Sequence, residues 1–337
     1  RSLGTQNSLY VNVLFDHTFH KSGKHAHHEH GHDHHEGDHE CEDEELPHKL
    51  SSGVSFQYDE IEETSNNSPN TINESVPGVF TEYTYSGIEN ISIVGGLRAD
   101  FHNQHGTYIS PRFHASYNPT GSFVVRASAG KGFRTAYIFA ENIGMMASSR
   151  DFAVQEELKP EEAWNFGLNT GFNINILNTD FQFDLDYYRT EFINQVVVDR
   201  DSDPREVKFS NLDGQSYANS FQANVSFSPV RGLNVLGAYR LNDVMTTIDG
   251  ELRQKPLNSL YKAFLNLGYT TYNEGWSFDF TFDFNGGGRL PDTDQNPSEY
   301  SRKDEFPAYL LLSSQITKKI GDFEIYLGAE NITDYRQ

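Results

Sequence analysis

The feature that most constrains the fold is a strict alternation of apolar and polar residues, repeated in segments of about ten residues. In the clearest segment five aromatic rings are separated by short polar side chains; the rings belong to Trp276, Phe278, Phe280, Phe282 and Phe284. Because successive side chains of a β-strand point to opposite faces, one face here carries rings and the other carries carboxylates. The pattern recurs along the chain and helical periodicity is almost absent, which predicts an all-β fold of two-faced strands.

The spacing of these segments predicts about 14 strands, beginning near residues 8, 51, 79, 91, 108, 123, 163, 180, 216, 232, 258, 276, 307 and 322. From residue 79 onward the connections alternate between tight turns and longer loops. The longer ones lie at 134–162, 194–215, 244–257 and 285–306, with a small one at 102–107. Short turns at one rim and long loops at the other are typical of an outer-membrane β-barrel, whose recognition loops face outward.

A soluble β-sandwich would alternate too, with its rings in a core. Strands of about ten residues match a tilted membrane crossing, whereas globular strands average about five or six residues. About 14 strands closed on one another would also enclose a lumen too wide for side chains to fill. We therefore favour a transmembrane antiparallel barrel with apolar faces toward lipid, and keep a soluble β-rich binding protein as the alternative. No apolar stretch approaches the roughly 20 residues of a membrane helix.

Charge and motif content exclude two broad classes of function. The chain has 48 acidic and 26 basic residues and a formal charge of -22, which argues against binding a nucleic acid. The sequence contains no Gly-x-Ser-x-Gly elbow and no phosphate loop, because Gly130-Lys131-Gly132 lacks the required spacing. We expect a protein that is not an enzyme and has no built-in cofactor.

Three local runs resemble the TonB-dependent outer-membrane receptors. Residues 127–136 contain the Gly-Phe-Arg run that ends a strand in that family. Residues 158–168 contain the Leu-Lys-Pro-Glu run that leads into its next strand, and residues 328–335 resemble the Glu-Asn-Leu-Thr-Asp turn near its last strand. The three runs occur in the family's order and cover the chain from about residue 76 to the end.

The resemblance implies a barrel of about 22 strands with an N-terminal plug. It also implies import of a scarce nutrient across the bacterial outer membrane, with energy from a TonB-type inner-membrane complex. This sequence departs from the pattern, since it carries no plug and supplies only about 14 strands. We therefore expect residues 1–337 to be the C-terminal part of such a barrel, with the plug and its TonB contact absent from the chain.

A histidine-rich and acid-rich insertion spans residues 20–50 and holds most of the chain's 14 His. Its candidate metal ligands are His25, His27, His28, His30, His32, His34, His35, His39 and Cys41. Imidazole, carboxylate and thiolate together suit Zn, Cu(II), Ni or Co better than Ca or Mg. Low complexity and scarce apolar residues predict disorder without metal. We expect transition-metal binding, with Zn or Cu foremost; a solvated insertion without a role, or a tag, are the alternatives.

Counting strands back from the loop at 134–162 places this insertion on the periplasmic side, where it would hold metal after passage. If the count were wrong by one strand, the insertion would face outward, where it would capture metal.

Weaker candidates lie elsewhere. His102 and His105 are three residues apart on a predicted outward loop and could contact the transported ligand, with His114 on the next strand. Met145 and Met146 could offer sulfur to Cu(I), but a hydrophobic loop contact is the interpretation we prefer. Asp184, Asp186 and similar acids are expected to line a hydrated lumen.

The sequence thus predicts an outer-membrane receptor that imports a transition metal ion or metal chelate, with outer-membrane lipid and a TonB-type complex as its partners. The alternatives left open are a siderophore or cobalamin receptor whose insertion is incidental, and the soluble β-rich protein.

Overall fold

The computed structural model describes residues 3–20, 45–65 and 68–336. In these residues strands predominate, with one short α-helix, α1 (Ile138–Glu141), and two short 3-10 helices, Ile143–Ala147 and Ser298–Tyr300. None of the helices described is long and apolar enough to cross a membrane. The chain divides into two compact units, residues 1–115 and 116–337. Fourteen strands follow one another in chain order within the main sheet, with β14 pairing β13 off that path, so the predicted number of strands is confirmed.

The first unit is built from long strands that pair with their neighbours in sequence. These are β1 (Leu3–His20), β2 (Glu45–Ser65), β3 (Ser68–Ile88) and β4 (Ile91–His102), followed by β5 (Gly106–Thr120), which continues into the second unit. β2 and β3 pair in an antiparallel register from Ser65 opposite Ser68 to His48 opposite Tyr85. The sequence pattern placed the start of β3 near residue 79 and so left the polar stretch before it outside any strand. That prediction is wrong, because continuous backbone pairing carries both strands through this polar stretch.

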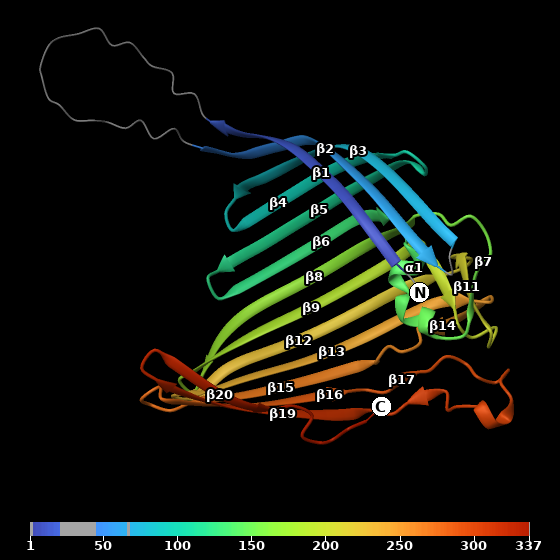
Figure 1. The fold of residues 1–337 in the computed structure, drawn as a ribbon. Helices are drawn as coiled ribbons and strands as arrows, with labels where there is room; N and C mark the ends of the chain where they lie inside the picture. Colours follow the sequence, from blue (N-terminus) through green and yellow to red (C-terminus); the bar gives the residue numbers. More distant parts are fainter. Residues whose placement is uncertain (1–2, 21–44, 66–67, 337) are drawn as a thin grey trace, which may run out of the picture. The chain divides into compact units, whose positions relative to one another are not determined.

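The second unit continues the antiparallel arrangement. Its long strands are β6 (Phe123–Arg134), β8 (Glu161–Ile176), β9 (Thr179–Asn194), β12 (Ser216–Val230), β13 (Leu233–Ile248), β15 (Tyr261–Thr270), β16 (Trp276–Asn285), β19 (Tyr309–Ile320) and β20 (Phe323–Ala329). Each pairs with the next in this order, and in Figure 1 they run side by side. The strands around Phe181 and Phe280 start within a few residues of the predicted positions.

The two ends of the second unit's strands differ in their connections. At one end the strands turn tightly, as between β8 and β9, where Leu177 and Asn178 have φ values of 52° and 61°. Two consecutive residues with positive φ match the twist of a hairpin turn. At the other end lie the long connections 135–160, 195–215, 249–260 and 286–308. The predicted alternation of short and long connections is therefore present (Figure 1).

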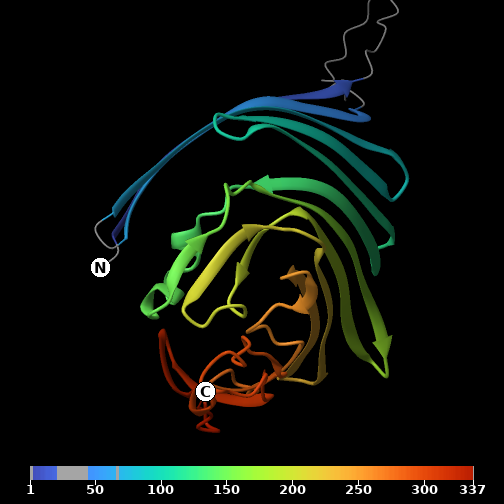
Figure 2. The same ribbon diagram turned by 90° about the vertical axis from the view of Figure 1, so that its right-hand side faces the viewer.

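The long connections contain short strands that the sequence pattern did not predict. These are β7 (Asp151–Val154), β10 (Val196–Asp199), β11 (Glu206–Asn211), β14 (Glu251–Gln254), β17 (Gly288–Arg289) and β18 (Glu305–Phe306). β11 pairs with β10 in an antiparallel and with β7 in a parallel register, so two connections form one small sheet. Figure 2 shows both connections on the concave side of the second unit's strands.

Many apolar side chains of the long strands are exposed, unlike those of a globular protein. Leu168, Phe166 and Phe280 are each 45% to 51% exposed, as are many apolar side chains on the strands. Among the residues described only six hydrophobic side chains are buried, namely Ile61, Val196, Val197, Val207, Phe209 and Ile248. Val196, Val197, Val207 and Phe209 belong to β10 and β11. The long strands thus expose their apolar face, as strands that meet lipid do.

Candidate functional site

The predicted metal ligands from His25 to Cys41 lie outside the described residues. The strands that flank them are described, and β1 ends at His20 while β2 begins at Glu45. In this antiparallel unit those two ends lie at the same end of the sheet as the turn between β3 and β4. Among the residues described, no group of three or more His, Cys, Asp or Glu is arranged to hold a metal ion.

His102 and His105 are described, and the structure brings them together at the end of β4. Their ring centroids are 4.7 Å apart. The Nδ1 atom of His102 accepts hydrogen bonds from the backbone N–H groups of Gln104 (3.1 Å) and His105 (3.3 Å), and Nε2 lies 3.7 Å from Oε2 of Glu74 on β3. His102 is only 5% exposed, so its imidazole shapes the turn from within. A ligand role for the two residues stays a prediction.

The Gly-Phe-Arg and Leu-Lys-Pro-Glu runs meet at one ion-pair network in the second unit. Nε of Arg134 donates to Glu161 (2.6 Å), and its two Nη atoms donate to Glu141 (3.1 and 3.0 Å). The second oxygen of Glu161 accepts the backbone N–H of Val196 at 3.0 Å. Arg134 ends β6, Glu141 lies in α1 and Val196 begins β10, so this network fixes where connections 135–160 and 195–215 leave the strands.

These two connections share a small hydrophobic core. Val196, Val207 and Phe209 form its centre, and Phe209 is fully buried. Packed against them are Ala136, Ile138, Met145, Phe152, Leu158 and Val198. The preferred interpretation of Met145 as a hydrophobic contact is therefore confirmed. Since a loop with its own core holds its shape, residues 135–160 and 195–215 form a defined surface.

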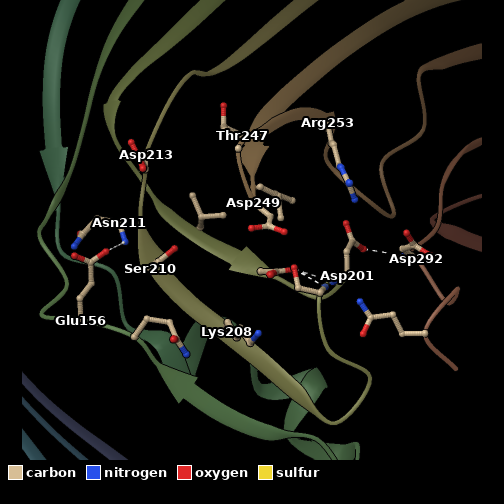
Figure 3. A pocket seen from close by; sticks show the side chains of 17 residues that line it. Glu156, Asp201, Lys208, Ser210, Asn211, Asp213, Thr247, Asp249, Arg253 and Asp292 are labelled. Atoms are coloured by element: carbon tan, nitrogen blue, oxygen red, sulfur yellow. Dashed lines mark hydrogen bonds between the residues drawn. The ribbon is translucent and has the colours of Figure 1, made fainter.

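A polar cavity of about 700 Å³ lies between this small sheet and its neighbours. Six carboxylates line it, from Glu156, Asp199, Asp201, Asp213, Asp249 and Asp292. Lys208 and Arg253 are its two cationic side chains, and no aromatic ring contributes to the wall. Figure 3 shows side chains from four connections and from the end of β13 around the cavity, with Asp213 at one side, Asp292 at the other and Asp249 between them. We call this the acidic cavity.

Asp199 is held in its charged form at the edge of the acidic cavity. Its Oδ1 atom accepts the backbone N–H groups of Asp201 (2.8 Å) and Ser202 (3.0 Å). Burial raises the pKa of Asp199, but the hydrogen bonds from Ser202 and from these backbone groups, together with the positive charge of Lys208, outweigh it. The net effect is a pKa below the ordinary value of 3.8, so the carboxylate stays negative at any physiological pH.

One arginine joins three of the connections beneath the acidic cavity. Nη2 of Arg289 donates to Asp201 at 2.7 Å, and its Nε donates to the carbonyl oxygen of Gln254 at 2.8 Å. The other oxygen of Asp201 accepts the backbone N–H of Asp292 at 2.9 Å. The Asp201 side chain is 2% exposed and that of Arg289 is 18% exposed. Connections 195–215, 249–260 and 286–308 are therefore tied at a single buried ion pair.

A family model described as "TonB dependent receptor-like, beta-barrel" matches residues 5–332. The chain belongs to this family. Its members are outer-membrane transport receptors and not enzymes, so the predicted family, barrel class, location and lack of enzyme activity are confirmed, and the soluble alternative is wrong.

The chain is similar to one curated outer-membrane protein and to several solved structures. An iron-regulated outer membrane virulence protein of Vibrio cholerae is 20% identical over 290 residues, which are 82% of this chain and 43% of that protein. The ferric enterobactin receptor of Pseudomonas aeruginosa superimposes with a TM-score of 0.71 at 13% identity, over 99% of this chain and 50% of that one. A siderophore receptor of Acinetobacter baumannii gives 0.68 at 12% identity, over 98% and 51%. The chain therefore spans about half the length of the relatives it matches.

The cavity residues were not among the sequence-based candidates. Most of them come from the run Asp199 to Asp213 and from the turn at Asp249, which the sequence analysis treated only as polar loop. The signal present was an acidic, turn-rich stretch between two short apolar runs, Val196 to Val198 and Val207 to Phe209. Those runs predict short strands, but no local pattern indicates which loops meet.

Proposed function

We propose that this chain is the barrel part of an outer-membrane receptor that imports a transition metal, as an ion or a small chelate, with energy from a TonB-type inner-membrane partner. The observation that carries the proposal is the acidic cavity at the end where the long connections lie, in a chain that belongs to a receptor family. The names of the relatives, which refer to iron regulation and to siderophores, agree with a metal-linked cargo.

The size of the acidic cavity favours a chelate over a bare ion. Its volume of about 700 Å³ falls within the range of small-molecule sites, roughly 300 to 1,000 Å³. A bare ion also needs ligands converging at about 2 to 2.5 Å. The described residues present no such group of three.

The charge of the acidic cavity favours a neutral or cationic complex. Six carboxylates and two cationic side chains line the cavity, and among the residues described only Asp201 is paired with a further cation, Arg289, so an excess of negative charge remains. A multiply anionic complex would have to overcome this repulsion. The absence of aromatic side chains from the wall likewise favours a hydrophilic chelate over one built from flat rings.

In this proposal the histidine-rich insertion receives the metal after passage. Long connections mark the outward end of the strands in outer-membrane barrels, and counting strands back along the chain from the long connection 135–160 assigns His20 and Glu45 to the opposite, periplasmic end. Imidazoles and carboxylates on the periplasmic side would retain a transition metal and limit its loss outward. The candidate ligands remain His25, His27, His28, His30, His32, His34, His35, His39 and Cys41.

A second candidate is a siderophore receptor whose insertion is incidental. It is favoured by the siderophore receptors among the similar structures, although at 12% to 13% identity these indicate the fold alone. The two candidate functions differ in whether transport requires the insertion. Import of a metal would require its histidines, whereas import of a siderophore would not.

The test is metal uptake by cells that express the full-length receptor. One variant replaces the eight histidines from His25 to His39 with Asn, which keeps length and acidity. A matched control replaces the same number of acidic residues between Glu29 and Glu45 with Gln or Asn. Loss of accumulation for one metal among Zn, Cu, Ni and chelated Fe, in the histidine variant, would support the proposal and name the metal. Unchanged uptake of every metal would leave the siderophore candidate.

The cavity itself is tested by removing two of its charges. Asp213→Asn with Asp249→Asn should lower uptake of the same metal several-fold, because the attraction for a cationic complex falls with the charge. Glu274→Gln with Asp322→Asn is the matched control, since both are exposed acids in tight turns and neither lines the cavity. Equal uptake in both variants would remove the acidic cavity from the proposal.

A further inference from the structure

A second, smaller cavity lies beside the acidic cavity and has a different charge. Its volume is about 240 Å³, and it shares Val197 and Ile248 with the acidic cavity as wall residues. Its remaining walls are apolar in part, with Val196, Val198 and Pro256. The cationic side chains around it are Arg134, Arg200 and Lys255, and the acidic ones are Glu141 and Glu161. We call this the basic cavity.

The two acids of the basic cavity, Glu141 and Glu161, are both paired with Arg134. Both accept hydrogen bonds from Arg134, Glu161 through Nε at 2.6 Å and Glu141 through the two Nη atoms. Glu161 in addition accepts the backbone N–H of Val196. Arg134 is thus compensated by carboxylates, and no acid that lines the cavity is left for Arg200 or Lys255.

Arg200 has no such compensation. Its guanidinium forms no hydrogen bond and no ion pair with any residue the structure describes, and the same holds for the ammonium group of Lys255. Arg150 is close as well, since its Nη1 atom donates to the carbonyl oxygen of Arg200 at 3.1 Å. The carboxylate of Asp201, the next residue, is bound to Arg289. Positive charge therefore accumulates at the basic cavity without a partner.

The lack of an acceptor for Arg200 is accompanied by a lowered pKa of its guanidinium. Burial lowers the pKa of Arg200, the positive charge of Arg150 lowers it further, and Asp201 opposes the shift. A partly buried guanidinium without an acceptor has lost water and gained nothing in exchange. An anion bound in the cavity would supply the missing acceptor, and the planar guanidinium matches a carboxylate or phosphate through two parallel hydrogen bonds.

We propose that the basic cavity is a binding site for a small oxyanion, a carboxylate or phosphate group, held chiefly by the guanidinium of Arg200 with Lys255 as the second contact. A volume of about 240 Å³ accommodates such a group with a few additional atoms. The site goes beyond the proposed function, because anion binding here requires no transport. Its oxyanion could be a free anion or the carboxylate arm of a chelate whose metal lies toward the acidic cavity.

The experiment uses the full-length receptor purified in detergent and three probes: inorganic phosphate, citrate and zinc citrate. Binding is measured by titration calorimetry and by the melting temperature of the protein. Wild type is compared with Arg200→Gln and Lys255→Gln. Arg205→Gln is the matched control, because Arg205 belongs to the same connection, is exposed and lines neither cavity.

At least one probe should bind wild type and Arg205→Gln equally. Its binding to Arg200→Gln should weaken by about tenfold or more, the loss of a charge-assisted hydrogen-bond pair, with a smaller loss in Lys255→Gln. Without anion, Arg200→Gln should melt no lower than wild type, because a residue that only stabilised the loop would lower the melting temperature. If phosphate and citrate bind as well as zinc citrate, the site takes free anions, and tighter binding of zinc citrate indicates the arm of a chelate.

The proposal is overturned if none of the probes binds wild type at millimolar concentration, or if Arg200→Gln and Arg205→Gln change binding equally. Should Arg200→Gln fail to fold, unchanged binding in Lys255→Gln would overturn it as well. Transport is not part of these measurements, so a failure of the proposed metal import leaves their result intact.

Discussion

The long strands expose their apolar side chains, whereas the small sheet of β7, β10 and β11 buries them. On β16 the ring of Phe280 is 49% exposed, whereas on β11 the ring of Phe209 is fully buried. The strand needs no core beneath it because lipid takes its apolar face, and backbone pairing with its neighbours supplies its hydrogen bonds. The small sheet lies where lipid is absent and must bury its apolar residues against one another.

The largest difference is expected between two phenylalanines changed to alanine. Phe209→Ala removes the centre of the small core and should destabilise the β7, β10 and β11 sheet by about 3 to 5 kcal/mol, the cost of a cavity in a packed interior. Phe280→Ala should cost less, about 1 to 2 kcal/mol, because lipid or detergent fills the space of the ring and no cavity is left. Hydrogen exchange of the backbone amides in β10 and β11 measures the first effect, and urea unfolding in detergent the second. Equal effects would mean that the connections have no core of their own.

The buried ion pair beneath the acidic cavity comes next. Asp201→Ala leaves Arg289 without its carboxylate and should destabilise the joined connections by about 3 kcal/mol, because an uncompensated buried charge remains. Hydrogen exchange in connections 249–260 and 286–308 should rise together. The double variant with Arg289→Ala should recover part of the loss, since neither charge is then left alone. Asp294→Ala, an exposed control, should change little; a purely additive double variant would contradict the role of the pair.

These two regions also differ in how far the sequence predicts them. The alternation of apolar and polar residues, as around Phe181 and Phe280, predicted the number of long strands and the position of most turns. It could do so because every long strand has one face toward lipid and one toward the lumen. The stretch from Ile61 to Pro77 was missed because its polar residues broke the pattern, while backbone pairing alone continues the two strands there.

The candidate site was far less predictable. Asp201 and Arg289 are 88 positions apart in sequence, and their contact depends on which connections meet in space. Neither residue has a local signal that distinguishes it from the other charged residues of the loops. The sequence analysis placed the runs at Val196 and Val207 in a loop, and the parallel pairing of β11 with β7 follows from tertiary packing. His102 was correctly placed at a turn, and its burial against Glu74 was not anticipated.

A charge placed on the exposed apolar face of the long strands tests whether that face meets lipid. Phe280→Arg, at the middle of β16, should destabilise the barrel by about 2 to 4 kcal/mol in lipid bilayers, because the guanidinium would face hydrocarbon. Thr281→Arg points to the opposite face and should cost about 1 kcal/mol, through the lost hydrogen bond from Asn266. Urea unfolding of the full-length receptor in lipid vesicles measures both. If the two substitutions cost the same, the exposed rings do not mark the lipid face.

The smallest effect concerns Asp199, whose carboxylate organises the turn after β10. Asp199→Ala removes an acceptor of two backbone N–H groups and should cost about 1 kcal/mol of local stability at neutral pH. Because the pKa of Asp199 is lowered in the folded protein, its contribution is fully present above the ordinary value of 3.8 and is lost as pH falls through the lower folded value. The gap in hydrogen-exchange protection between wild type and variant should therefore persist from pH 7 to pH 4 and close only in stronger acid. Glu206→Ala in the same connection is the control, because Glu206 accepts neither of these N–H groups, and a gap that closed between pH 6 and pH 5 would mean that Asp199 is not held in its charged form.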